Sequence, residues 1–415
     1  MKKKSIALAI ALSALTAVTA SAQEEATEEN TAATIYSPIT TGASFLSVAP
    51  DARGGGLGDV GAATSPDLDA QYWNPAKYAQ MNGVGGASIS YVPWLRKLVN
   101  DMDLISASGY YKIKNVQAVA MSFRFFSIGN VLMTKNADDA GMNFKPYDLS
   151  LDASYSRILS KHFSMGVALR FVYSDLTGGY SVDGQYVKPG WAISADIAGS
   201  YRHPFSMNGG TGYGAFGFNI SNIGSKINYG DYNSSSFLPA NLRLGGSVTM
   251  AADAYNHVSI SLDINKLLVP GRPTKNTSIE DAEEQSKDLQ NRLDEYHQMN
   301  SITGIFRSFA DMPDGSAYDF KSQLQKMMFS IGFEYDYDNR FFGRVGYYNE
   351  SKVQGNRKYF TFGVGFRLNV FALDVAYVLS VTKQNPLDQT LRFSLGFNMG
   401  GLKSLAGVKT EDELD

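Results

Sequence analysis

Residues that commonly carry out catalysis or bind metals are sparse in this sequence. It has no cysteine, and its four histidines (His162, His203, His257 and His297) are widely spaced, without the close pairs that hold zinc. There is no Gly-x-Ser-x-Gly motif and no cluster of Ser, His and Asp. A glycine-rich run at residues 53–58 lacks the Lys-Ser/Thr pair that follows a phosphate-binding loop. We therefore expect no enzymatic activity, no metal and no cofactor.

The remaining candidates for chemistry are eleven charged residues that alternate with apolar residues. Six arginines face five acids, and we take Arg367 and Asp374 as one pair among them. A set of both signs favours a network of buried salt bridges. A selective path for ions would favour one sign of charge instead. The eleven residues are Arg124, Asp152, Arg170, Asp196, Arg243, Asp263, Glu334, Arg344, Arg367, Asp374 and Arg392.

The elements that must position these charges are strands. From residue 84 to residue 399, large apolar residues alternate with small or polar ones, which is the pattern of half-buried strands. In residues 357–368, for example, phenylalanine and valine on one face oppose threonine and glycine on the other. Fourteen such segments lie at 84–94, 101–113, 116–129, 146–159, 163–175, 190–202, 213–222, 239–250, 257–266, 326–337, 340–349, 357–368, 371–382 and 389–399.

The connections between these segments alternate in length. Tight turns follow even-numbered segments, at 114–115, 160–162, 338–339 and 369–370, with somewhat longer links near 203–212 and 251–256. Most odd-numbered segments are followed by longer loops, at 130–145, 176–189, 223–238 and 267–325. One-sided loop lengths are typical of outer-membrane barrels, in which the apolar face meets lipid. The sequence predicts an all-β protein, a fourteen-stranded antiparallel transmembrane β-barrel with long external loops and both termini in the periplasm.

The rest of the chain divides by composition. Residues 1–22 have three lysines, an apolar stretch and Ala20-Ser21-Ala22, as in a cleaved signal peptide. Residues 23–42 form an acidic disordered linker, 43–83 a plug, 84–399 the barrel, and 400–415 a periplasmic tail. Losing the three signal-peptide lysines lowers the formal charge from −3 to −6. This charge disfavours nucleic acid as a partner.

The plug is expected because a fourteen-stranded cylinder is too wide for wall side chains to fill. Residues 43–83 are rich in Gly, Ala, Asp and Pro and contain no good strand. Glycines at 54–58 let this backbone pass close to other backbone. We expect the segment to occupy the lumen.

The external insert at 267–325 is too long to be a simple connection. Residues 278–298 are acidic and compatible with a helix, and an amphipathic turn follows. Its apolar residues either pack over the barrel mouth or dock a partner, and the same alternatives apply to the first loop. The candidate partner-binding residues are Trp94, Leu95, Ile305, Phe306 and Phe309.

Two motifs in the plug resemble a known superfamily. Pro50-Asp51-Ala52-Arg53 with its glycines, followed by Trp73, Asn74, Pro75 and Ala76, resembles the N-terminal plug of FadL-type fatty acid transporters. With residues 90–95, residues 109–112 and the long insert, the chain resembles the PorV family of type IX secretion barrels over residues 43–399.

This resemblance implies a secretion function without catalysis. Such barrels receive secreted cargo, through its C-terminal signal domain, from a translocon barrel. They deliver it to a surface complex containing the sortase-like PorU, where it is joined to lipopolysaccharide of the outer membrane. Two alternatives are a FadL-like transporter or channel for hydrophobic small molecules and a lipid-modifying enzyme. The charged lumen disfavours the first, which needs an apolar lining, and the missing catalytic motifs disfavour the second.

Overall fold

The computed structural model describes residues 39–96, 101–133, 141–176, 181–182, 185–186, 188–230, 235–276, 278–382 and 387–400. The predicted signal peptide, most of the predicted linker and residues 401–415 of the predicted tail lie outside these ranges. Among the described residues, no helix is both long enough and apolar enough to cross a membrane.

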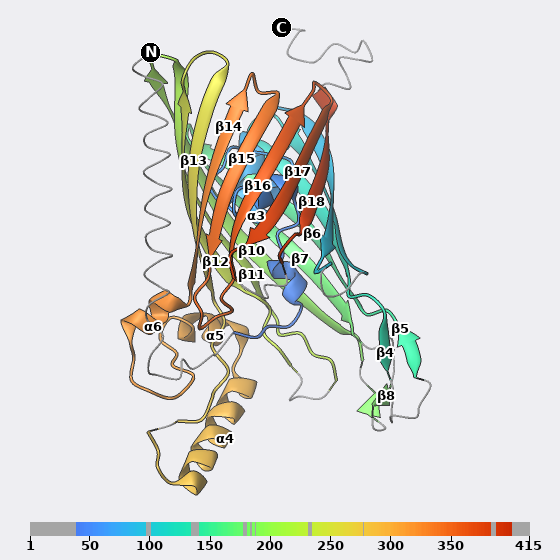
Figure 1. The fold of residues 1–415 in the computed structure, drawn as a ribbon, viewed down its shortest axis with the longest axis vertical. Coiled ribbons are helices and arrows are strands. Elements are labelled where there is room, and N and C mark those ends of the chain that lie inside the picture. The colour runs from blue at the N-terminus through green and yellow to red at the C-terminus, as the bar shows by residue number, and fades with distance from the viewer. Residues whose placement is uncertain are drawn as a thin grey trace. The chain divides into compact units, whose positions relative to one another are not determined.

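Fourteen antiparallel strands form a closed barrel (Figure 1), as the alternating segments predict. Each strand pairs with the next barrel strand along the chain, and β1 pairs with β18 to close the cylinder. The strands are β1 (Gly85–Trp94), β2 (Met102–Ile113), β3 (Gln117–Ser127), β6 (Tyr147–Ser160), β7 (Phe163–Asp175), β10 (Gly190–Met207), β11 (Gly210–Gly224), β12 (Asn241–Ala251), β13 (Asn256–Leu267), β14 (Met327–Tyr337), β15 (Phe341–Asn349), β16 (Lys358–Arg367), β17 (Phe371–Ser380) and β18 (Leu391–Asn398).

Alternation sets the two faces of the wall. Along β16, Phe362 and Val364 are exposed, whereas Thr361 and Gly363 are buried. The exposed apolar face is the one that lipid can solvate, because lipid cannot solvate charge or unpaired polar groups. The opposite face, with its small residues and most of the inward charges, therefore lines the lumen.

One predicted connection is wrong. The link expected at 203–212 is only a two-residue turn, because β10 continues to Met207 and β11 begins at Gly210. The alternating pattern stops there because all five of residues 203–207 are exposed, so neither face of the strand needs to be apolar. This extension brings His162 and His203 together, with ring centroids 4.5 Å apart.

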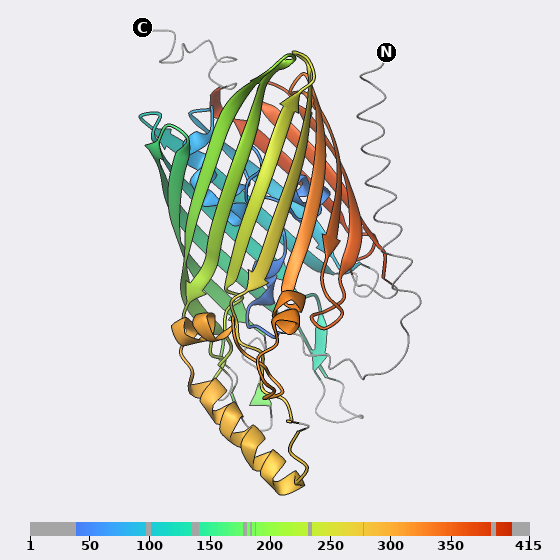
Figure 2. The ribbon, with the colours of Figure 1, turned by 90° about the vertical axis from the view of Figure 1, so that its left-hand side faces the viewer.

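The tight turns lie at one end of the barrel and the long loops at the other (Figures 1 and 2). Two hairpins extend from the loops, β4 (Val131–Met133) with β5 (Met142–Phe144) and β8 (Ser181–Val182) with β9 (Gln185–Tyr186). The insert forms α4 (Ala282–Gln298), α5 (Ser301–Arg307) and α6 (Phe320–Gln325). Asp281 caps α4 by accepting hydrogen bonds from the N–H groups of Glu283 and Glu284.

The N-terminal segment lies within the barrel (Figure 2) and forms η1 (Ser44–Ser47), α2 (Ala52–Gly56), α3 (Ala70–Trp73) and η2 (Pro75–Gln80). We call residues 43–83 the plug. It contacts the wall where inward strand residues are glycines, so that backbone meets backbone. A Cβ at Gly217 would lie 2.0 Å from the carbonyl oxygen of Ala62, and one at Gly346 would lie 2.1 Å from the nitrogen of Gly58. These glycines provide the space that the plug occupies.

Candidate functional site: the plugged lumen and the helical insert

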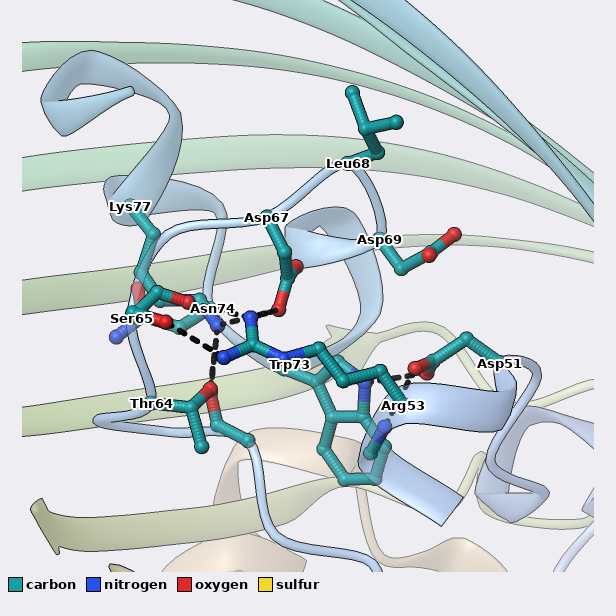
Figure 3. Close-up of polar contacts among 12 residues, drawn as sticks. Asp51, Arg53, Thr64, Ser65, Asp67, Leu68, Asp69, Trp73, Asn74 and Lys77 are labelled. Atoms are coloured by element: carbon teal, nitrogen blue, oxygen red, sulfur yellow. Dashed lines mark hydrogen bonds and ion pairs between the residues drawn. The ribbon is translucent and has the colours of Figure 1, made fainter. Parts of the chain in front are cut away.

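Trp73 organises the plug from within. Asp51 caps α2 through the N–H of Gly54 at 2.7 Å and accepts the indole N–H of Trp73 at 2.6 Å (Figure 3). The indole ring fills the space beside Gly54 and Gly61, where a Cβ would lie 2.3 and 2.2 Å from ring atoms. The glycine-rich run and Trp73 therefore form one packed unit.

Asn74 connects this unit to the wall. Its side-chain oxygen accepts the N–H of Ala76 and starts η2, in which Pro75 takes the first position. Its amide donates to the carbonyl of Ala62 within the plug and to that of Gly199 on β10. The predicted plug motif from Trp73 to Ala76 thus contains the internal packing contact, the helix cap and a bond to the wall.

Arg53 joins the plug to β14. It is 4% exposed, and its guanidinium donates to both oxygens of Glu334, at 3.2 and 3.0 Å. It also donates to Asp67 at 2.7 Å and to Ser65 (Figure 3). Glu334 is shared, because it also accepts from Arg344 at 2.6 Å. The cluster therefore holds the plug and two neighbouring strands together.

Other inward charges also contact the plug. Asp263 on β13 accepts the N–H groups of Gly61 at 2.8 Å and Ala62 at 3.0 Å. Arg392 on β18 donates to Asp59 at 2.6 Å. Arg243 on β12 lies over the ring of Trp73, 4.6 Å from its centroid.

A second network lies within the wall itself. Arg170 on β7 donates to Asp152 on β6 at 2.5 Å and to Asp196 on β10 at 3.0 Å. Arg124 on β3 lies 3.7 Å from Asp152. All four side chains are at most 3% exposed, so these ions depend on one another rather than on water.

The expected pairing of Arg367 with Asp374 is wrong. Asp374 accepts from Arg344 at 2.6 Å, and Arg367 instead lies over the ring of Phe342, 4.4 Å from its centroid. Gly365 explains why Asp374 binds Arg344 rather than Arg367. Asp374 lies directly across from Gly365, and the Arg344 guanidinium passes through the space that a side chain there would fill.

The charges of the plug were missed by sequence reasoning, which treated this segment as filler. Burial alone would raise the pKa of Asp67, but Lys77 and Arg53 outweigh burial and lower that pKa. Burial raises the pKa of Asp69 well above its usual range, and the carboxylates of Asp51 and Asp67 add to this effect. The sequence did contain a signal, because several acids and two cations lie in a strand-poor segment that is expected to fill a lumen lined with charged residues.

The wall network makes a stability prediction. Replacing Arg170 with methionine removes the guanidinium that binds Asp196 and leaves Asp152 with the more distant Arg124, at 3.7 Å. We expect the free energy of unfolding to fall by roughly 3–5 kcal/mol. The matched control is Arg340→Met, because Arg340 and Asp338 form an ion pair that is 65% and 37% exposed. That change should cost less than about 1 kcal/mol. Denaturant unfolding of the barrel measures both, and equal losses would contradict the prediction.

Among the described residues, the barrel contains two cavities with charged linings. One of about 330 Å³ near the turn end is lined by Arg53, Asp67, Asp69 and Arg367, among others. One of about 90 Å³ toward the loop end is lined by Arg124, Arg243 and Arg357, among others. Neither offers the mainly apolar lining that hydrophobic ligands prefer.

The candidate partner-binding residues fall into two groups. Trp94 and Leu95 are half-buried and pack against apolar clusters at the loop end, and Ile305 packs against a cluster that includes Phe237. Phe306 and Phe309 are exposed, by 73% and 44%. Among the five candidates, Phe306 and Phe309 are therefore the most available to contact another molecule.

The insert also encloses a cavity of its own, of about 320 Å³. Its walls are mostly apolar, and two arginines reach it. Burial raises the pKa of Tyr296, one of the lining residues, because it disfavours the phenolate. The lining includes Pro270, Arg292, Tyr296, Met299, Arg307, Ala310, Pro313 and Tyr318. A recess of this kind can accept an apolar side chain from a partner.

Comparisons with solved structures find barrels at low identity. The chain is similar to the Ralstonia pickettii toluene transporter TbuX, with 11% identity over 84% of this chain and 97% of that one, and a TM-score of 0.44. The Pseudomonas putida toluene transporter TodX has 12% identity over 85% of this chain and 96% of that one, with a TM-score of 0.46. A Pseudomonas aeruginosa FadL homologue has 10% identity over 87% of this chain and 99% of that one, with a TM-score of 0.41. A comparison with curated proteins found no match.

A family model gives the assignment. The model described as type IX secretion system protein PorV matches residues 30–274, which is more than half of the chain. The matched range contains the plug and the barrel strands from β1 to β13. With its closed fourteen-stranded barrel, this outer-membrane protein belongs to the PorV family of the type IX secretion system.

Proposed function

We propose that this protein binds secreted cargo by its C-terminal signal domain and passes it from the translocon barrel to the surface attachment complex containing PorU. There the cargo is joined to lipopolysaccharide. The observation that supports this proposal is the contrast between the plugged lumen and the loop end of the barrel. The lumen holds a plug fastened by buried ion pairs, whereas the loop end carries helices and a cavity. Family membership supports a place in secretion, and the loop end is the surface where a folded protein can bind.

The lumen does not favour the alternative of a transporter for hydrophobic small molecules. Its two cavities have charged linings, and the plug occupies the space between the walls. An apolar solute would lose its favourable surroundings at each arginine or aspartate that it passed. We infer that the protein acts by binding and release rather than by catalysis or solute passage.

We propose that the cavity in the insert receives part of the cargo signal domain. Ala310 lines this cavity, so Ala310→Trp should fill it. We expect a loss of roughly 2 kcal/mol in binding free energy, or about thirtyfold in affinity, as for a blocked anchor pocket. The measurement is binding of a purified C-terminal signal domain, from a protein that the same cells secrete, to the detergent-extracted barrel.

Ala282→Trp is the matched control for this experiment. Ala282 begins α4, and Tyr296, which lines the cavity, lies fourteen positions later, so the two are about 21 Å apart along the helix. The control should bind cargo normally. In cells, Ala310→Trp should leave cargo unattached, whereas Ala282→Trp should not. Normal delivery by Ala310→Trp would move the proposed cargo surface away from the cavity.

The proposal requires the loop end to face outward and both termini to lie in the periplasm. We expect tags at Asn115 or Asp338, in the tight turns, to be unreachable on intact cells. Tags at Glu284 or Asn356, in α4 and the loop before β16, should be reachable. Antibody labelling of intact and permeabilised cells measures this. Labelling of the Asp338 tag on intact cells would reverse the proposed orientation.

A further inference from the structure

Part of the insert packs on the outside of the barrel. Leu242 on β12 lies next to Arg243, which points into the lumen, so Leu242 points outward. Its cross-strand partners at the same level are Ile220 on β11 and Lys266 on β13. Ile220 and Leu242 pack in one apolar cluster with Met299 and Ile305 of the insert. The start of the insert and α5 therefore cover the lipid-facing side of the wall at its loop end.

Lys266 on β13, the strand next to β12, is also covered on its outward side. It points outward, like Ile264, yet it is only 3% exposed. Its ammonium lies 5.4 Å from the centroid of the Phe309 ring. Nearby, Lys326 forms an ion pair with Asp311 at 2.9 Å. The segment after α5 therefore covers the outer wall at β13.

The next outward row, two residues further from the loop end, is open. Leu244, Ile264 and Phe329 are paired across β12, β13 and β14. They are 37%, 41% and 41% exposed, as expected for side chains that touch acyl chains. The lipid-facing wall therefore begins directly below the insert, with no polar row between them on these strands.

The insert presents exposed apolar residues beside this part of the wall. Ile302, Phe306 and Phe309 follow the i, i+4, i+7 spacing of one helical stripe and are 55%, 73% and 44% exposed. On α6, Phe320 and Leu324 are one turn apart and are 65% and 41% exposed. Exposure to water would penalise so many apolar side chains in two short helices and the turn after α5, whereas the boundary of a bilayer stabilises them.

We propose that α5 and α6 lie on the bilayer, with these five side chains in the boundary between headgroups and acyl chains. The occupant of this surface is lipid, because α5 and α6 contact strands β11 and β14 next to the exposed, lipid-facing row of the wall. The inference depends on the membrane position of the barrel and not on cargo binding. It gives Phe306 and Phe309 a lipid role and leaves the insert cavity for a protein partner.

The absence of cysteine makes a direct test possible, since single-cysteine variants need no background changes. Phe306→Cys and Phe320→Cys are labelled with an environment-sensitive fluorophore and placed in phosphatidylcholine vesicles. One set of vesicles contains phosphatidylcholine spin-labelled near its carbonyl groups, and a second contains phosphatidylcholine spin-labelled near the chain ends. We expect both labels to lose emission most strongly with the shallow spin label.

Two positions calibrate the test. Leu262→Cys, on the exposed wall of β13 at 53% exposure, should be quenched more by the deep spin label than the insert positions are. Glu284→Cys, on the exposed start of α4, should be quenched by neither. Heat-dependent migration of the unboiled protein verifies that each variant is folded.

The proposal is overturned if the labels at 306 and 320 behave like the label at 284. It is equally overturned if they are shielded only after a cargo signal domain is added, since the stripe would then bind protein. Quenching by lipid that is unchanged by the signal domain supports it. A failure of cargo binding in the Ala310→Trp experiment leaves this result unaffected.

Discussion

Replacing Gly346 with valine is expected to force the plug from its position and open the barrel to ions. Gly346 lies on β15 and faces the lumen, where a Cβ would lie 2.1 Å from the nitrogen of Gly58 and 2.2 Å from the carbonyl carbon of Leu57. Both contacts are with backbone, which cannot rotate away as a side chain can. Valine is otherwise favourable in a strand. The measurement is single-channel conductance in planar bilayers, with the wild type conducting poorly.

Gly343→Val is the matched control on the same strand. Gly343 points outward, and nothing lies within 4 Å of a Cβ placed there. This variant adds the same side chain to β15 but touches lipid rather than the plug. We expect it to fold and to conduct as poorly as the wild type. If both variants opened the barrel, the cause would lie in the strand and not in the plug.

Deleting residues 43–81 is expected to have the largest effect on conductance. The deletion removes Arg53, Asp59 and the backbone N–H groups of Gly61 and Ala62, which bind Glu334, Arg392 and Asp263. A fourteen-stranded barrel without its filling leaves an aqueous channel, so conductance should rise by roughly an order of magnitude or more. An intact protein that already conducted like an open porin would contradict this prediction.

The deletion should also reduce stability, because Arg392, which is 1% exposed in the intact protein, loses the carboxylate of Asp59. Unfolding in denaturant should therefore occur at a lower concentration than in Gly343→Val. If conductance rose with no loss of stability, the buried ions of the wall would be satisfied by water rather than by the plug. The two measurements together separate filling of the lumen from bracing of the wall.

The barrel could be predicted from the sequence because lipid imposes one rule on every strand. A residue such as Val364 must be apolar, and its neighbour Gly363 must fit the interior. Each strand segment therefore alternates apolar and small residues with a period of two. The prediction failed at residues 203–207, where β10 is mostly exposed on both faces and the rule no longer applies. The strand prediction is therefore accurate where lipid surrounds the strand, and it does not depend on how strongly the residues favour a strand.

The pairing of lumen charges could not be predicted in the same way. Alternation says that Arg344, Arg367 and Asp374 share a face, but it does not say which arginine reaches the acid. That depends on the space above Gly365, which exists only once β15, β16 and β17 are in register. The part played by Arg53 was hidden for a related reason, since its partner Glu334 lies 281 positions away.

The position of the insert was also beyond the reach of sequence reasoning. Its apolar residues predicted contact with the barrel mouth or with a partner, and the outer wall was not considered. Ile220, Leu242 and Lys266 become one row only through the register of three strands, and only that row identifies the surface beneath α5. Local patterns could identify amphipathic segments but not the side of the wall on which they pack.

The plug reaches opposite arcs of the barrel, and this has a mechanical consequence. Helix α2 contacts β15 to β18, whereas η2 contacts β2, β3, β6, β7 and β10. Hydrogen bonds between strands resist an increase in the circumference of the barrel. They do little to stop its circular cross-section from flattening into an ellipse. A strut fixed at both ends of a diameter prevents this deformation. We therefore expect the plug to resist flattening of the barrel and so to keep the spacing of the loops that the strands carry.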